Sequence, residues 1–266
     1  MNKEKEELKW GTMIPLIGGS AIGCNKATGN LPAFHLSYEA FAANESHIED
    51  YWPDVPMYRI DHEELDIPNK TFEQVDFVNS VCPCAGLSQL NSASGSASSR
   101  GSDAVQNQWM YNSAEYVLEN VKPKVLWGEN APGLFTKMGE GVVNNLKAIG
   151  EKYGYSFSLI KTNTELHGIP QRRIRTFYFF WNTPTVPMLG WKFREKKHLI
   201  DYLAEVPEDA TLQDMFMVEG KVTDHYKPYE FVLEKEGLNH ADFAKKFGKG
   251  TIAQYLEKNE LLDECI

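Results

Sequence analysis

The stretch VDFVNSVCPCAGLS, residues 75–88, combines the pattern of a buried strand with a reactive side chain directly after that strand. A buried strand is predicted by its apolar residues, Val75, Phe77, Val78 and Val81. The strand ends at Pro83, which cannot donate a ladder hydrogen bond, and Cys84 follows directly. In open α/β sheets, ligands collect outside the carboxyl ends of the strands. Cys84 is therefore a candidate nucleophile, although a free cysteine alone is more often a small buried hydrophobe.

Two further apolar segments lead to polar side chains of matching chemistry. Residues 124–128 (KVLWG) predict a buried strand, and Glu129 follows it at once. Residues 176–181 (TFYFFW) predict another strand, and the segment before it, GIPQRRIR, contains Arg173 and Arg175. A thiol, a carboxylate and paired guanidinium groups at strand ends suit addition to an electron-poor ring and its protonation.

Strands and helices alternate through the first two thirds of the chain, which predicts an α/β fold. Further strands are expected at residues 10–17, 34–39, 57–61 and 156–159, and helices at 40–51, 103–121 and 134–153. We expect a Rossmann-like, mixed but mostly parallel sheet flanked by helices. After Trp181 the chain becomes rich in prolines and polar residues, with short amphipathic helices expected at 197–204, 241–247 and 251–257. The predicted domains are 1–182 and a small, incomplete second lobe at 183–266.

Composition narrows the class of protein further. A chain of 266 residues with 42% hydrophobic residues can bury a sizeable core. No stretch is apolar enough to span a membrane, and the charged N-terminus lacks a signal-peptide core, so a cytoplasmic protein is expected. The four cysteines form no disulfide framework, and without a second Cys/His pair no metal site is expected. A net charge of −10 disfavours a generic nucleic-acid binder, but basic residues between 172 and 197 could supply a local strip.

The order Pro-Cys, Glu-Asn and Gln-Arg-Arg-x-Arg resembles the DNA cytosine-5 methyltransferase family over residues 10–181. The resemblance implies a fold that binds S-adenosylmethionine and transfers its methyl group to C5 of cytosine in double-stranded DNA, as in restriction-modification systems. It also implies a covalent intermediate on Cys84 with the target base flipped out of the helix.

The resemblance assigns roles to particular residues. Cys84 matches the nucleophile, Glu129 the carboxylate at N3 and the exocyclic amine, and Arg173 and Arg175 the guanidiniums at the cytosine. The turn Ile17-Gly18-Gly19 matches the cofactor turn, although such glycines can also simply form a turn. The remaining matches are Glu39 at the ribose, Asp61 near the adenine, and Ser88 and Arg100 at the DNA backbone. Asp61 could equally be a helix cap or a solvated acid.

Several departures from the family pattern leave other functions open. Leu16 stands where an earlier glycine is usual, Ile14 replaces an aromatic residue, and Ala85 replaces a glutamine. Two further blocks of the family pattern are not found in residues 183–266, so we expect a second chain or a further C-terminal segment to complete the enzyme. The alternatives are a non-catalytic DNA-binding or partner subunit with a degenerate methyltransferase fold, and an RNA cytosine-5 methyltransferase of the same family.

Overall fold

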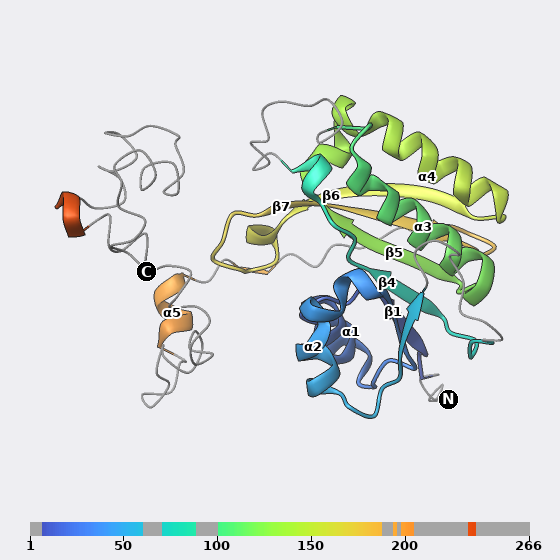
Figure 1. Ribbon diagram of the computed structural model, residues 1–266, viewed down its shortest axis with the longest axis horizontal. Coiled ribbons are helices and arrows are strands. Elements are labelled where there is room, and N and C mark those ends of the chain that lie inside the picture. Colours follow the sequence, from blue (N-terminus) through green and yellow to red (C-terminus); the bar gives the residue numbers. More distant parts are fainter. Residues whose placement is uncertain are drawn as a thin grey trace. The chain divides into compact units, whose positions relative to one another are not determined.

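One seven-stranded sheet organises the part of the chain that the computed structural model describes, which comprises residues 7–60, 71–88, 101–187, 194–195, 198–204 and 234–237 (Figure 1). The strands are β1 (Trp10–Met13), β2 (His35–Tyr38), β3 (Met57–Ile60), β4 (Phe77–Ser80), β5 (Val125–Asn130), β6 (Ser156–Asn163) and β7 (Ile174–Trp181). The helices are α1 (Gly19–Thr28), α2 (Ala42–Tyr51), α3 (Gln108–Tyr116), α4 (Glu140–Lys152) and α5 (Leu199–Leu203).

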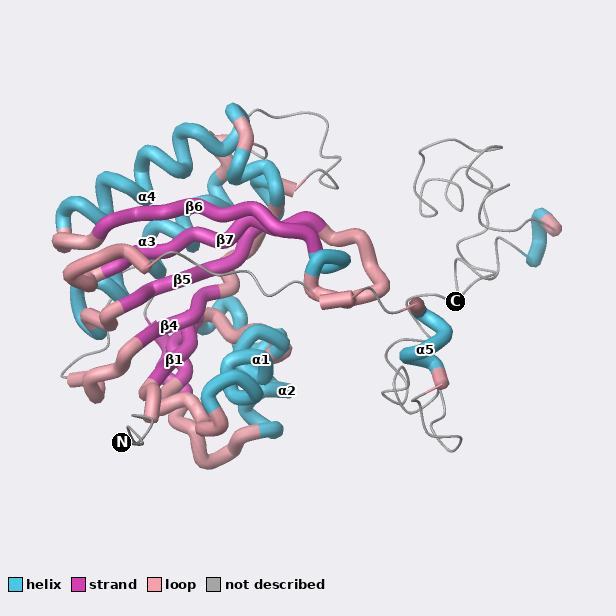
Figure 2. The backbone as a smooth tube through the Cα atoms, turned by 180° about the vertical axis from the view of Figure 1, so that it is seen from behind, coloured by secondary structure: helices cyan, strands magenta, loops and turns pink. Residues whose placement is uncertain are grey.

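The sheet is mixed and mostly parallel, in the order β3-β2-β1-β4-β5-β7-β6. Strands β1 to β5 pair in parallel, whereas β7 lies antiparallel between β5 and β6. Figure 2 shows these strands side by side from β6 to β1. The predicted α/β class and the mixed sheet are confirmed. Because the parallel strands run in one direction, the loops that follow β1, β2, β3, β4 and β5 all leave the same edge of the sheet.

Apolar side chains cover both faces of the sheet, because neighbouring residues of a strand point to opposite sides. Trp10 of β1 stacks on Phe77 of β4 with 5.8 Å between ring centroids, on the face covered by α1 and α2. Met13 and Val78, from the same two strands, belong to the other core. That second core receives side chains from α3 and α4, namely Met110, Ala114, Val142 and Leu146.

Some helices differ from the sequence expectation. Helix α1 was not predicted, because its sequence GSAIGCNKAT is polar and rich in glycine and buries only Ala21 and Cys24. The predicted helix at 103–121 is divided into a short 3-10 segment, α3 and a π-helical turn at Val117–Val121. The predicted helix at 134–153 begins as two 3-10 segments before α4. Helix α5 lies inside the predicted segment 197–204, and the segments 241–247 and 251–257 lie outside the described residues.

The chain divides into two compact units, Met1–His198 and Leu199–Ile266. The first contains the complete sheet, and the described part of the second contains α5 and the residues 234–237. The domain boundary predicted at residue 182 directly follows β7 and stays a prediction. None of the helices among the described residues has the length and apolar character needed to cross a bilayer.

Candidate active site

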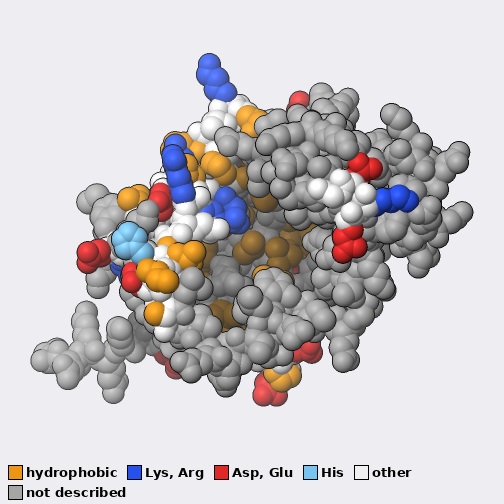
Figure 3. All heavy atoms as spheres, turned by 90° about the vertical axis from the view of Figure 1, so that its left-hand side faces the viewer, with side chains coloured by type: hydrophobic (Ala, Val, Ile, Leu, Met, Phe, Trp, Pro, Cys, Tyr) orange, Lys and Arg blue, Asp and Glu red, His pale blue; other side chains and the backbone are white. Residues whose placement is uncertain are grey.

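A cavity of about 580 Å³ opens where the loops after β4 and β5 meet the start of β7. Its lining residues come from four separate stretches of sequence: Cys84, Ser88, Ala131, Pro132, Thr136, Lys161, Gln171, Arg172, Arg173, Ile174 and Arg175. Figure 3 shows basic side chains beside a hollow that has hydrophobic side chains at its base. The fold therefore gathers four of the residues singled out from sequence, namely Cys84, Ser88, Arg173 and Arg175, around one cavity.

Cys84 lies at the start of a short 3-10 helix, Ala85–Leu87, and its side chain is half-buried. The Leu87 N–H donates a 3.0 Å hydrogen bond to the Cys84 carbonyl, which closes this turn. Cys82 is different, because its thiol is buried in the core 3.2 Å from the Ser80 hydroxyl oxygen. Burial raises the pKa of the Cys82 thiol, so it stays protonated and inert. Only Cys84 presents sulfur to the cavity among the described cysteines.

The side chain of Asn130, at the end of β5, is hydrogen-bonded to the loop that carries Cys84. Its amide nitrogen donates to the Cys82 carbonyl at 3.5 Å, and its side-chain oxygen accepts from the Ala131 N–H at 2.8 Å. The Asn130 side chain is fully buried, so both contacts are shielded from water. These two hydrogen bonds hold the loop that carries Cys84 in a fixed position relative to β5, the strand that carries Glu129.

Glu129 and Arg175 form an ion pair beside the cavity, which Arg175 lines. The Arg175 Nε and the Glu129 Oε1 are 2.5 Å apart, and both side chains are half-buried. The pairing of β5 with β7, with Glu129 opposite Phe177, brings the two side chains together. Burial raises the pKa of the Glu129 carboxyl, while the charges of Arg175 and Arg173 oppose that rise. Glu129 does not itself line the cavity and meets it through Arg175.

Arg173 is exposed and lines the cavity from the loop before β7. Its backbone N–H donates to the side chains of Asn163 and Thr164, at 3.2 and 3.0 Å, so the loop is tied to the end of β6. Ser88 also lines the cavity, whereas Arg100 lies outside the described residues.

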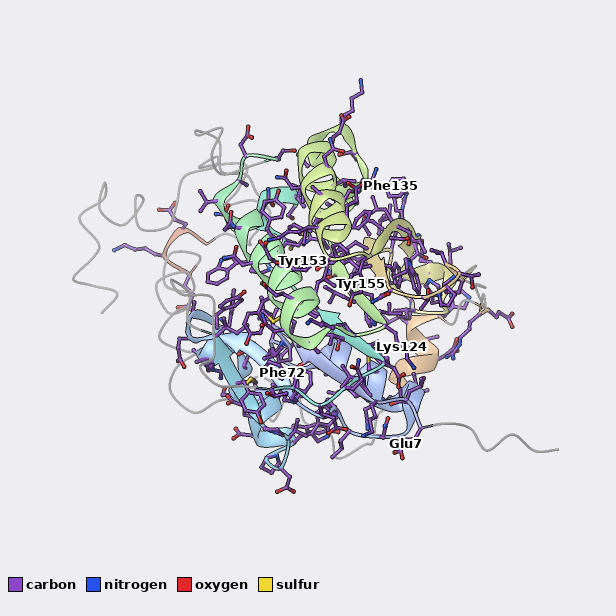
Figure 4. The ribbon with its side chains drawn as sticks, turned by 90° about the vertical axis from the view of Figure 1, so that its right-hand side faces the viewer. Glu7, Phe72, Lys124, Phe135, Tyr153 and Tyr155 are labelled. Atoms are coloured by element: carbon purple, nitrogen blue, oxygen red, sulfur yellow. The ribbon has the colours of Figure 1, made fainter. Side chains whose placement is uncertain are left out.

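Lys161 is a cavity residue that the sequence interpretation missed. It projects from β6, and its Nζ lies 5.2 Å from the ring centroid of Phe135, an exposed aromatic residue labelled in Figure 4. Nothing in the sequence around Lys161 distinguishes it from an ordinary surface lysine. Only the pairing of β6 with β7 places it beside the arginines.

The turn between β1 and α1, residues 14–18, has an unusual backbone. Gly18 has a φ of 86°, and Ile14 and Leu16 have φ values of 52°. Residues other than glycine rarely adopt such positive φ values. The glycine expected at position 16 from the family pattern would relieve this strain. Gly19 begins α1 and is exposed, and a Cβ placed on it would meet no atom within 4 Å.

These features fit the backbone of a nucleoside cofactor site. The open space above Gly19 lets a ligand approach the main chain, and Ile17 beside it is exposed. Glu39 is exposed and directly follows β2, the neighbour of β1 in the sheet. Asp61 directly follows β3 in sequence but lies outside the described residues.

Comparison with known proteins identifies the family. The sequence model of the C-5 cytosine-specific DNA methylase family matches residues 13–259. The type II methyltransferase M.NgoPII of Neisseria gonorrhoeae is 27% identical over 165 residues, which cover 60% of this chain and 44% of that protein. This chain therefore spans less than half of that relative's length.

A structural relative agrees with the fold. The methyltransferase EhMeth of Entamoeba histolytica superposes with a TM-score of 0.52 and 13% identity, over 86% of this chain and 67% of that one. An identity this low supports the fold alone. The family match extends over most of the sequence and confirms the resemblance inferred from the three motifs. This chain belongs to the C-5 cytosine-specific DNA methylase family.

Proposed function

We propose that this chain carries the catalytic centre of a DNA cytosine-5 methyltransferase that uses S-adenosylmethionine. The observation that supports this most strongly is the single cavity that joins the Cys84 thiol to the Glu129–Arg175 pair through Arg175. Membership of the C-5 cytosine-specific DNA methylase family supplies the substrate class, and the likeness to M.NgoPII suggests a restriction-modification context.

Cys84 is the proposed nucleophile. Its thiolate adds to C6 of the cytosine ring, and the C5=C6 electron pair becomes available at C5, which by itself is too weak a nucleophile. After C5 has been methylated, its proton leaves to a base, the C5=C6 bond re-forms and the Cys84 thiolate departs. Cys84 is only half-buried, which leaves its sulfur open to a substrate base.

Glu129 is the proposed acid of the addition step. A carboxyl group at N3 can donate or share a proton there while the thiolate attacks, which offsets the negative charge that develops in the ring. The raised pKa of Glu129 favours this role, because the group holds its proton to a higher pH than an exposed glutamate does. Arg175 orients Glu129, and its guanidinium offers a rigid donor fork toward the base.

The DNA partner has to present a base outside the helix, because Cys84 cannot reach C6 within stacked base pairs. The net charge of −10 is unfavourable for DNA in general. However, the cavity is lined by four cationic side chains, Lys161, Arg172, Arg173 and Arg175. This local positive field is proposed to hold the phosphates next to the flipped nucleotide, together with Ser88 and Arg100.

The proposed cofactor residues are Ile17, Gly18, Gly19, Glu39 and Asp61. When bound, S-adenosylmethionine supplies the methyl group. Gly19 leaves space for the ligand to approach the main chain, Gly18 supplies the left-handed backbone of the turn, and the Glu39 carboxylate can accept hydrogen bonds from two ribose hydroxyls. The family model matches the chain as far as residue 259, and a further segment or a second chain is proposed to supply the two family motifs that the sequence analysis did not find in residues 183–266. The 266 residues alone should bind the cofactor weakly, and tight cofactor binding together with full methylation by this chain alone would contradict that last point.

Covalent trapping tests the mechanism. Duplex DNA containing 5-fluorocytosine blocks loss of the C5 substituent, so the cofactor-loaded protein should form a stable adduct at Cys84. Cys84→Ser should abolish the adduct, and the matched control Cys82→Ser should retain it, because the Cys82 thiol is buried away from the cavity. An adduct that survives Cys84→Ser would exclude this mechanism.

The same assay separates the alternatives. No adduct from the complete wild-type protein, with the proposed further segment or second chain supplied and the cofactor bound, would favour a non-catalytic DNA-binding or partner subunit. Adducts formed on 5-fluorocytosine tRNA but not on DNA would identify an RNA methyltransferase of the same family. A cytoplasmic location stays a prediction.

A further inference from the structure

The most deeply buried charged side chain among the described residues outside the cavity is Glu45 of α2, which is fully buried. Its carboxylate accepts from the Ser37 hydroxyl at 2.5 Å and from the Arg59 Nη1 at 2.6 Å. The backbone N–H of Leu16 also lowers the pKa of this carboxylate. Burial raises the pKa of Glu45, and these donors oppose the rise. Three separate segments of chain thus meet on one carboxylate.

Helix α2 also contacts the turn of residues 14–18 through an apolar side chain, that of Ile48. Ile48 lies one helical turn after Glu45, and its Cδ1 would be 2.5 Å from a Cβ placed on Gly18. Glu45 therefore holds Leu16 by a polar contact, while Ile48 packs beside Gly18. Leu16 needs such support, because its left-handed backbone is strained for a residue with a side chain.

The segments joined by Glu45 are those that lead to the proposed cofactor residues. Leu16 directly precedes Ile17 and Gly18, Ser37 lies in β2 two residues before Glu39, and Arg59 lies in β3 two residues before Asp61. We infer that Glu45 is a positioning residue that holds the turn of residues 14–18 and the ends of β2 and β3 in the arrangement required for S-adenosylmethionine. This role rests on the proposed function and assigns Glu45 no contact with the ligand.

A purely stabilising ion pair would be the simpler explanation, but the energetics do not favour it. Removing a carboxylate from water carries a large desolvation penalty, so a buried ion pair is weak evidence for stability, and in some proteins such a pair instead fixes a particular conformation. Arg59 also binds Glu49, at 3.0 Å, so Glu45 is not needed merely to neutralise Arg59. Glu45 also binds the Ser37 hydroxyl of β2, so it joins β2 to β3, whereas the contact of Glu49 is with Arg59 of β3.

The test compares Glu45→Gln with the matched control Glu49→Gln in the full chain. Glutamine keeps the size of Glu45 but removes its charge and one acceptor oxygen, so it cannot accept from both the Ser37 hydroxyl and the Arg59 guanidinium as the two carboxylate oxygens do. Isothermal calorimetry with S-adenosylhomocysteine measures affinity. Hydrogen exchange without ligand compares the peptide of residues 14–18 with peptides of α3 and α4.

We expect Glu45→Gln to weaken binding of S-adenosylhomocysteine about tenfold or more, because the ligand then has to order the turn itself. Exchange should accelerate at residues 14–18 and not in α3 or α4, whereas a loss of global stability would accelerate all three. Glu49→Gln should bind within about twofold of wild type, since a partly exposed ion pair contributes little. If Glu45→Gln does not fold, Ile48→Val replaces it, with binding expected to weaken between about two- and tenfold.

The outcomes are distinct. Unchanged affinity and unchanged local exchange in Glu45→Gln, with a wild type that binds, would overturn the inference and leave the proposed function intact. If Glu45→Gln does not fold, unchanged affinity in Ile48→Val would overturn it in the same way. A wild-type chain that binds no S-adenosylhomocysteine even when the further segment or second chain is supplied would refute the proposed cofactor and the positioning role together.

Discussion

Gly18→Ala and Gly19→Ala should have opposite effects on stability although the two residues are adjacent. Gly18 has a φ of 86°, and a Cβ there would lie 2.5 Å from Ile48 Cδ1. The left-handed backbone costs a residue with a side chain about 1–2 kcal/mol. Displacing Ile48 adds overpacking of roughly 1–3 kcal/mol, which is reduced because the end of that side chain can move. Gly18→Ala should therefore destabilise the fold by about 2–4 kcal/mol.

Gly19→Ala changes the first residue of α1, which has no positive φ and no atom within 4 Å of a new Cβ. Alanine restricts the unfolded chain more than glycine does, so the folded state should gain about 0.4–1 kcal/mol. For a domain of this size, 1 kcal/mol corresponds to about 2–4 °C in Tm. We expect Tm to rise by about 1–4 °C in Gly19→Ala and to fall by roughly 5–15 °C in Gly18→Ala.

Measuring the binding of S-adenosylhomocysteine distinguishes a role of Gly19 in the cofactor site from an effect on stability alone. If Gly19 lets the main chain approach the cofactor, its new methyl group occupies that space, and the more stable variant should bind S-adenosylhomocysteine at least about tenfold more weakly. Thermal denaturation and calorimetry on the same samples measure both quantities. A Gly19→Ala protein that is stabilised and binds as tightly as wild type would show that this turn is not the cofactor site.

Three further variants probe the cavity. Arg175→Gln should lower kcat by about a hundredfold or more and move the alkaline limb of kcat/KM to higher pH, because the guanidinium no longer opposes the burial that raises the Glu129 pKa; an unmoved limb would show that Glu129 is not the titrating acid. Lys161→Ala should reduce the slope of log K against log salt for DNA binding by about 0.9, with Lys26→Ala as the control; equal slopes would exclude a phosphate contact at Lys161. Asn130→Ala should lower stability by about 1–3 kcal/mol in denaturant titrations, because the buried Ala131 N–H loses its acceptor; full stability would mean that water replaces the amide.

The strands that carry the cavity could be predicted from sequence because each is a short apolar run with a clear end. β4 stops before Pro83, and β5 and β7 bury alternating or nearly continuous apolar side chains. Parallel pairing places the ends of β4 and β5 at one edge of the sheet, and the antiparallel β7 begins at that same edge. For this reason three motifs that are far apart in sequence could be expected to meet.

Other features depend on tertiary contacts that no local pattern reveals. Helix α1 buries too few residues to show a period, and its glycines argue against a helix. Glu45 is a glutamate on a largely polar helix, which from sequence alone predicts an exposed side chain. Its burial arises because Ser37, Arg59 and the Leu16 backbone converge on it from other segments.

Cys82 and Cys84 are neighbours in sequence, but the structure gives their thiols different surroundings. Strand alternation places Val78, Ser80 and Cys82 on one side, and all three are buried. Pro83 ends that alternation, and Cys84 begins a 3-10 turn that exposes part of its side chain to the cavity. The pKa of the Cys82 thiol is raised by burial, so only the residue beyond the break is available for attack. The reactivity of this Cys-Pro-Cys segment therefore depends on the path of the backbone after the sheet ends at Ser80, because that path leaves Cys82 in the core and brings Cys84 to the cavity.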